Sequence, residues 1–148
     1  MILYMDASAL VKRYIAESGS EDVNAWISTA EATVTSLVTR TEVAAAICRA
    51  ARMKLILEED AQKSLQVFRT EWNKLQRLPV TETTAALADH LACEHGLRGY
   101  DAIHLAATML WQETLNIPVI LVTFDNELIL AAKGVGLEVL PGSIQYAT

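Results

Sequence analysis

Four acidic residues of the chain adjoin apolar segments instead of lying in hydrophilic ones. They are Asp6 in MILYMDAS, Glu42 in TSLVTRTEVAAA, Asp101 in RGYDAIHLAA and Asp125 in VILVTFDNEL. If the fold gathers them, they repel one another, since two like charges roughly 4 Å apart cost about 4 kcal/mol at an effective dielectric of about 20. A divalent cation offsets this repulsion, and carboxylate oxygens suit Mg²⁺ or Mn²⁺ better than Zn²⁺. Such a site indicates metal-dependent attack on phosphate esters.

Each of these acids also has a purely structural explanation. Asp6 and Asp125 follow predicted strands and can cap the helices that come next. Glu42 comes three residues after Thr39, which is the spacing of a capping box. Asp101 lies in the first turn of a predicted helix, where the macrodipole favours a negative charge. Taken together, however, the four acids match the place where open α/β sheets bind ligands, beyond the carboxyl ends of the strands.

The elements that must position these side chains alternate between strands and helices. Short apolar runs indicate strands, and runs with apolar residues every three or four positions indicate helices. The predicted strands are Ile2–Met5, Thr33–Ser36, Val119–Thr123 and Glu138–Leu140. The predicted helices are Ala7–Ala16, Glu21–Ala30 with Ser20 as its cap, Arg40–Ala51, a long helix from Leu57 to about Leu78, Thr81–Glu94, Tyr100–Leu115 and Asn126–Lys133. The alternation predicts an α/β protein with helices on both faces of a parallel sheet, in one domain over residues 1–148.

Composition and charge limit the classes of protein that fit. With 148 residues, of which 52% are hydrophobic, the chain can bury a sizeable core and is not disordered. No apolar run reaches the roughly 20 residues that a membrane-spanning helix needs, and MILYMDAS lacks the basic start of a signal peptide. We therefore expect a cytoplasmic protein without a membrane partner. The net charge of −6 argues against a general nucleic-acid coat protein, but it permits a nuclease whose metal holds the phosphate.

The motifs around the four acids, in this order, resemble those of the PIN domain family of metal-dependent ribonucleases. The resemblance covers essentially the whole chain and is nearest to the small VapC-type toxins. It rests on DAS at Asp6–Ser8, on Glu42 opening an alanine-rich helix, on YDAIHLA at Tyr100–Ala106 and on TFDNEL at Thr123–Leu128. It implies a PIN-like three-layer α/β/α sandwich with a central, mostly parallel sheet. It also implies endoribonuclease activity with Mg²⁺ or Mn²⁺.

Carried over residue by residue, the resemblance makes Asp6, Glu42, Asp101 and Asp125 the catalytic set. Asp6 and Asp101 match the acids that hold the metal ion. Glu42 matches the acid that supports the site or orients water, and Asp125 matches the position that varies most within the family. Hydrolysis by a metal-activated water then predicts a 5′-phosphate and a 3′-hydroxyl as products.

Four further residues are candidates for contact with the substrate or for support of the acids. Ser8 matches the small hydroxyl residue that follows the first Asp, and Thr123 is placed to act in the same way. His104 lies on the same side of its helix as Asp101; it touches substrate or site water, or it is a buried residue with its hydrogen bonds satisfied, which is the favoured alternative. Arg40 begins a series of basic residues that either steers RNA toward the site or forms a solvated helix face.

The resemblance also implies partners. It predicts the toxin of a type II toxin–antitoxin pair, with RNA as substrate and a small antitoxin protein as inhibitor. Small domains of this kind commonly dimerise, so we expect a homodimer, with the apolar stripe over Leu57–Leu75 serving as core and in part as subunit contact. One alternative is a phosphoacceptor signalling domain, which needs a second acid next to Asp6 and a Lys directly after a late strand, where this chain has Thr123-Phe-Asp125. The other is a catalytically inactive PIN-like module that binds RNA or protein.

Overall fold

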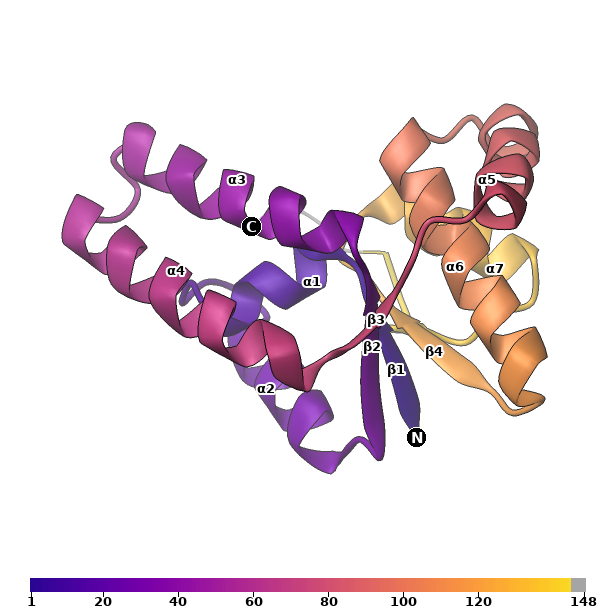
Figure 1. Cartoon of the computed structure of the whole chain (residues 1–148), viewed down its shortest axis with the longest axis horizontal. Helices are drawn as coiled ribbons and strands as arrows, with labels where there is room; N and C mark the ends of the chain where they lie inside the picture. The colour runs from indigo at the N-terminus through magenta and orange to yellow at the C-terminus, as the bar shows by residue number, and fades with distance from the viewer. Residues whose placement is uncertain (145–148) are drawn as a thin grey trace.

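The computed structural model describes residues 1–144, and within them the strands form one parallel sheet (Figure 1). The five strands of this range lie in the order β3-β2-β1-β4-β5, and every neighbouring pair is parallel. Their bounds are β1 Ile2–Met5, β2 Ala32–Ser36, β3 Gln76–Leu78, β4 Val119–Val122 and β5 Val139–Leu140. The strand order reverses at β1, which pairs with β2 on one side and with β4 on the other. This reversal makes the carboxyl end of β1 the place where an open α/β sheet binds ligands.

Helices cover both faces of the sheet, so the expected three-layer α/β/α sandwich is confirmed. Figure 1 shows α1 to α4 on one side of the sheet and α5 to α7 on the other. Their bounds are α1 Ala7–Leu10, α2 Ser20–Thr29, α3 Val38–Arg52, α4 Glu58–Glu71, α5 Glu82–His95, α6 Gly99–Leu115 and α7 Asn126–Gly134, with 3₁₀ turns η1 at Val11–Arg13 and η2 at Trp72–Lys74. No helix of the described residues combines the length and apolarity that a membrane span requires.

Side chains of β1 alternate between the two hydrophobic cores. Leu3 and Met5 lie in the core under α1 to α4, whereas Tyr4 lies in the core under α5 to α7. This period of two is the ordinary consequence of strand geometry. The stripe expected on the long helix is core as well, because Leu65 and Phe68 are buried in the first of these clusters.

The long helix predicted from Leu57 to about Leu78 begins within one residue of the observed start, but its predicted end is wrong. Helix α4 begins at Glu58 and ends at Glu71; after η2, residues Gln76–Leu78 form the edge strand β3. Gln76 and Arg77 are exposed, so β3 has no apolar pattern, and only its pairing with β2 fixes it as a strand. A strand of this kind cannot be predicted from the pattern of apolar residues in the sequence.

The start of the chain also differs from expectation in its helices. The predicted helix Ala7–Ala16 ends at Leu10 and continues as a 3₁₀ turn. Ser20 is the first residue of α2, and its cap is Gly19, whose φ of 91° lies in the left-handed region. A Cβ at Gly19 would lie 2.8 Å from the Phe124 ring, so both the backbone angle and the space there require glycine.

Candidate active site

The predicted acids lie around the carboxyl edge of the sheet, beside the end of β1. Asp6 directly follows β1, and Asp125 follows β4 and precedes α7. Glu42 lies near the start of α3, which follows β2, and Asp101 lies in the first turn of α6. We call Asp6, Glu42, Asp101 and Asp125 the acidic cluster.

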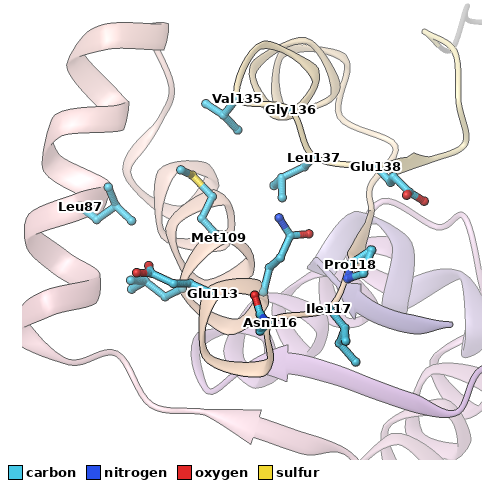
Figure 2. A pocket seen from close by; sticks show the side chains of 12 residues that line it. Leu87, Met109, Glu113, Asn116, Ile117, Pro118, Val135, Gly136, Leu137 and Glu138 are labelled. Carbon is cyan, nitrogen blue, oxygen red and sulfur yellow. The ribbon is translucent and has the colours of Figure 1, made fainter.

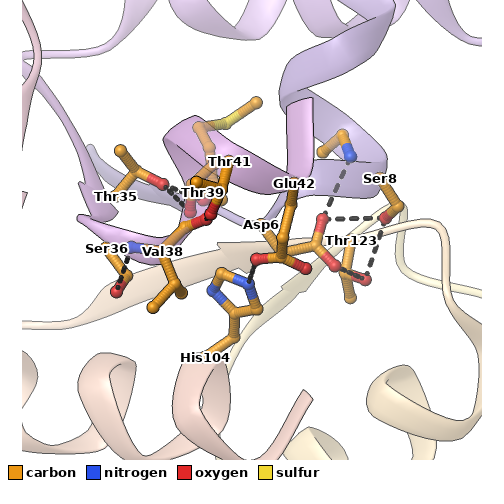
Figure 3. Close-up of polar contacts among 12 residues, drawn as sticks. Asp6, Ser8, Thr35, Ser36, Val38, Thr39, Thr41, Glu42, His104 and Thr123 are labelled. Carbon is orange, nitrogen blue, oxygen red and sulfur yellow. Dashed lines mark hydrogen bonds and ion pairs between the residues drawn. The ribbon is translucent and has the colours of Figure 1, made fainter. Parts of the chain in front are cut away.

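Asp6 is buried, and hydrogen bonds fix its carboxylate (Figure 3). Its Oδ1 accepts from the Ser8 hydroxyl at 2.8 Å and from the Ala9 amide at 3.0 Å. Its Oδ2 accepts from the Thr123 hydroxyl at 2.7 Å. The bond from Ala9 is the helix cap that the sequence suggests, so Asp6 caps α1 and also faces the acidic cluster.

Ser8 and Thr123 join the loops after β1 and β4. Each hydroxyl gives its hydrogen to Asp6 and accepts from a backbone amide: Ser8 from Phe124 at 2.9 Å, and Thr123 from Asp125 at 3.1 Å. The two hydroxyl oxygens lie 3.3 Å apart. Their observed contacts therefore hold Asp6 in place and tie the β4 loop to it.

Glu42 is held by His104, which reaches it from the opposite helical layer. The His104 ring is 1% exposed, and its Nε2 lies 2.7 Å from Glu42 Oε1. On its other side, Nδ1 lies 2.8 Å from the Tyr4 hydroxyl oxygen. Both ring nitrogens thus have partners, as in the favoured of the two expectations for His104. Figure 3 shows the imidazole beneath the carboxylates of Glu42 and Asp6.

The capping box suggested for Glu42 is wrong. Helix α3 begins at Val38, so Thr39 lies inside its first turn and not at its cap. The Thr39 hydroxyl accepts from the Thr35 hydroxyl at 2.8 Å, away from the α3 amides. This leaves Glu42 without a role at the start of its own helix.

Asp125 and Asp101 complete the acidic cluster from the side of β4 and α6. Asp125 caps α7, since its Oδ1 accepts from the Leu128 amide at 3.0 Å. Asp101 is half-buried and close enough to Asp125 and Asp6 for their charges to act on it. The structural explanations of Asp6 and Asp125 are thus correct, and they are compatible with a shared site.

Residues 3–134 match the sequence model of the PIN domain family. The chain belongs to the PIN domain family. It is similar to Ribonuclease VapC49 of Mycobacterium tuberculosis, with 30% identity over 143 residues that cover 97% of each chain. Among solved structures it is similar to PAE2754 from Pyrobaculum aerophilum, with a TM-score of 0.66 and 23% identity over 95% of this chain and 85% of that one. It is also similar to a toxin–antitoxin complex from Klebsiella pneumoniae, with a TM-score of 0.64 and 17% identity over 97% and 99% of the two chains.

Burial and neighbouring like charges raise the carboxyl pKa of acids in this PIN domain. Burial raises the pKa of the Asp6 carboxyl, although His104, Thr123 and Ser8 act against the rise. Burial, followed by the charges of Asp125 and Asp6, raises the pKa of Asp101 to about 6. For His104 burial acts downward, but the hydrogen bond to Glu42 and the nearby acids outweigh it, so its pKa is raised. The raised pKa of Asp101 thus shows that the negative charges of the acidic cluster are not fully compensated by nearby positive charges.

The donors present fit a hard divalent cation. Each carboxylate oxygen has two lone pairs, so Asp6 Oδ2, which accepts one hydrogen bond, keeps one for a cation. Within residues 1–144 no group of three or more His, Cys, Asp or Glu side chains is arranged to hold an ion together. Mg²⁺, however, is usually bound by one or two carboxylates and keeps several waters. Asp6 and Asp101, which are the two ligands expected from the sequence, are carboxylates of this kind.

The raised pKa of Asp101 predicts how its ionisation affects stability without metal. In the folded PIN domain the Asp101 carboxyl binds its proton up to about pH 6, whereas the reference value for the unfolded chain is 3.8. The folded state therefore holds more protons in this range, and the Asp101 contribution to the free energy of unfolding falls as the pH rises through it. Urea unfolding in EDTA should show the wild type losing stability relative to Asp101→Asn between these pH values. Parallel pH curves for the two proteins would contradict the assignment.

A cavity of about 630 Å³ opens away from the acidic cluster, beside the start of β4 (Figure 2). Leu87 of α5, Met109 of α6 and Leu137 before β5 are among its walls. None of the four acids lines it. Its walls carry two acids, Glu113 and Glu138, against the four of the acidic cluster, which is therefore the better candidate for a metal-dependent active site.

The sequence predicts the four acids of the site, but it does not predict all of the residues around them. It does not single out Tyr4, although the period of two in β1 puts Tyr4 and Asp6 on the same side of the chain. It also omits Arg98, whose charge lowers the pKa of Asp101 from a position three residues before it. Arg40 is exposed on α3, and the hydrogen bonds that hold Asp6 and Glu42 do not include it.

Proposed function

We propose that this PIN domain is a metal-dependent endoribonuclease and the toxin of a type II toxin–antitoxin pair. The observation that carries the proposal is the convergence of Asp6, Asp101 and Asp125, with Glu42 joined to them through His104, at the point where the strand order reverses. The family match and the relatives named as ribonucleases support it. A single domain over residues 1–148 and a cytoplasmic location, both expected from the sequence, are part of the proposal.

The roles of the side chains follow from their contacts. Asp6 and Asp101 are the proposed ligands of Mg²⁺ or Mn²⁺, an ion that lowers the pKa of bound water and neutralises charge on a phosphate oxygen. Ser8 and Thr123 keep the Asp6 carboxylate in one orientation. Glu42 is the group available to orient the attacking water. Asp125 adds negative charge at the start of α7.

The reaction that these roles serve is hydrolysis of a phosphodiester bond. A water oxygen attacks phosphorus, the bond from phosphorus to the 3′-oxygen breaks, and the products carry a 5′-phosphate and a 3′-hydroxyl. Catalysis by a pair of histidines does not fit the site. His104 is buried with both ring nitrogens engaged, and His90 and His95 of α5 each pair with Glu94, which is not one of the four acids.

The proposed partners are RNA and a small antitoxin. The structural neighbours include a toxin–antitoxin complex and VapBC2 from Rickettsia felis. An antitoxin Arg or Lys placed among the carboxylates would form charge-assisted hydrogen bonds with them in place of the cation. A homodimer is also part of the proposal.

The four acids are all present, which disfavours the inactive PIN-like module.

Cleavage of a mixed structured RNA pool tests this function. The full chain with Mn²⁺ or Mg²⁺ should produce fragments, and the same preparation in excess EDTA should leave the RNA intact. Fragments should be degraded by an exonuclease that requires a 5′-phosphate. Equal cleavage with and without EDTA would contradict metal dependence, and fragments ending in a 2′,3′-cyclic phosphate would contradict the proposed chemistry.

A further inference from the structure

The bond between His104 and Glu42 crosses from one helical layer to the other. Glu42 belongs to α3, which packs against the core under α1 to α4. His104 belongs to α6, which packs against the core under α5 to α7 (Figures 1 and 3). Their contact at 2.7 Å passes over the carboxyl edge of the sheet.

The partners of His104 fix both the position and the orientation of its ring. An ionised carboxylate can only accept, so Nε2 carries the hydrogen that Glu42 receives. The Tyr4 hydroxyl, 2.8 Å from Nδ1, then donates to a neutral ring or accepts from a protonated one. In either state, turning the ring over would break both hydrogen bonds.

Tyr4 is itself held firmly. It is fully buried in β1 and packs edge-on against the His104 ring, with the ring centroids 5.8 Å apart. Ser36, at the end of β2, lies close enough to the Tyr4 hydroxyl to lower its pKa, against the larger rise that burial causes. The central strand of the sheet thus supports the histidine, and the histidine supports the carboxylate.

We propose that Tyr4 and His104 are positioning residues that hold the Glu42 carboxylate toward the acidic cluster, without contact with RNA. The proposal rests on the ribonuclease function proposed above. Glu42 is a long side chain on the rim, with 25% of it exposed, so without His104 it has several rotamers open to it. Because loss of such alignment affects the chemical step more than binding, it should lower kcat and leave KM nearly unchanged.

The first test replaces Tyr4 by phenylalanine, which removes only the hydroxyl group. In RNA cleavage with Mn²⁺, Tyr4→Phe should lower kcat about tenfold, the size expected for one hydrogen bond to a group that positions a charge, with KM changed less than about twofold. Tyr14→Phe is the matched control, because the Tyr14 hydroxyl also has a side-chain hydrogen-bond partner, the Glu71 carboxylate, which is not part of the acidic cluster. It should leave kcat and KM at wild-type values.

The second test separates the two bonds of the ring. In His104→Gln the amide nitrogen can reach the place of Nε2 and donate to Glu42, whereas in His104→Asn it lies near the place of Nδ1 and falls short. Both variants lose the imidazole, so a purely structural role predicts equal kcat at equal melting temperature. Positioning of Glu42 predicts a kcat about tenfold higher for His104→Gln than for His104→Asn.

The outcomes distinguish this inference from the function on which it rests. If the wild type cleaves RNA and Tyr4→Phe or both His104 variants retain full kcat, the positioning role is wrong and the nuclease stands. If the wild type cleaves no RNA with any divalent metal, both proposals fall. A proton NMR signal from His104 Nε2 that exchanges slowly with water and shifts in Glu42→Gln is also expected, and its absence would contradict the hydrogen bond itself.

Discussion

Replacing Asp6 by asparagine is expected to reduce the kcat of RNA cleavage by about a hundredfold or more. Asparagine keeps the size of the side chain but removes the negative charge that the proposed cation needs. It also exchanges one oxygen for an NH₂ donor, and both Asp6 oxygens face donors from Ser8, Ala9 and Thr123. The amide therefore loses a hydrogen bond as well as a ligand. Initial rates in saturating Mn²⁺ measure the effect.

Two controls make the result of Asp6→Asn specific. Glu113→Gln makes the same chemical change at an exposed residue of α6 outside the acidic cluster, and it should keep full activity. Circular dichroism should show that Asp6→Asn remains folded at the assay temperature. Wild-type activity in folded Asp6→Asn would remove the proposed role of the acidic cluster altogether.

Replacing Phe68 by alanine is expected to lower the free energy of unfolding by about 3–5 kcal/mol. Phe68 is fully buried on α4 and lies edge-on between Tyr14 and Trp72, with ring centroids 5.1 and 5.6 Å away. Alanine removes the ring that joins the other two and leaves a cavity that rigid neighbours cannot fill. Urea unfolding measures the change in stability.

The neighbouring Val67 supplies the matched control for Phe68. It is 49% exposed on the same helix, so Val67→Ala should change the free energy of unfolding by no more than about 0.5 kcal/mol. Both variants shorten an apolar side chain one position apart, and only burial differs between them. Equal destabilisation by the two would show that α4 does not pack as described.

Much of the scaffold could be predicted from local patterns in the sequence. The apolar run before Asp6 and the one before Thr123 are strands that lie side by side as β1 and β4. The helix predicted over Thr81–Glu94 matches α5 to within one residue at each end, because Thr81 caps its start and Gly96 ends it. The alternation of strands and helices predicted a parallel sheet with helices on both faces, and the family resemblance identified it as a PIN-like sandwich.

The support of the acids could not be predicted in the same way. Tyr4 and His104 are 100 residues apart, and His104 and Glu42 are 62 apart, so only the packing of α6 against the sheet brings them together. The residue types gave candidates in Ser8, Thr123 and His104, but not their partners. The edge strand β3 escaped prediction because its pairing with β2, rather than any apolar pattern, defines it.

The place of β4 beside β1 bears on how such a protein is made in the cell. Asp6 leaves the ribosome early, but β4, one of the two strands that pair with β1, and the Thr123 hydroxyl that binds Asp6 come more than 100 residues later. Translation adds roughly 5–20 residues per second. A growing chain therefore spends several seconds with Asp6 and Glu42 already synthesised while the acidic cluster is still incomplete. The proposed catalytic site is therefore incomplete until β4 has emerged, which gives the proposed inhibitor time to be present before the complete enzyme is.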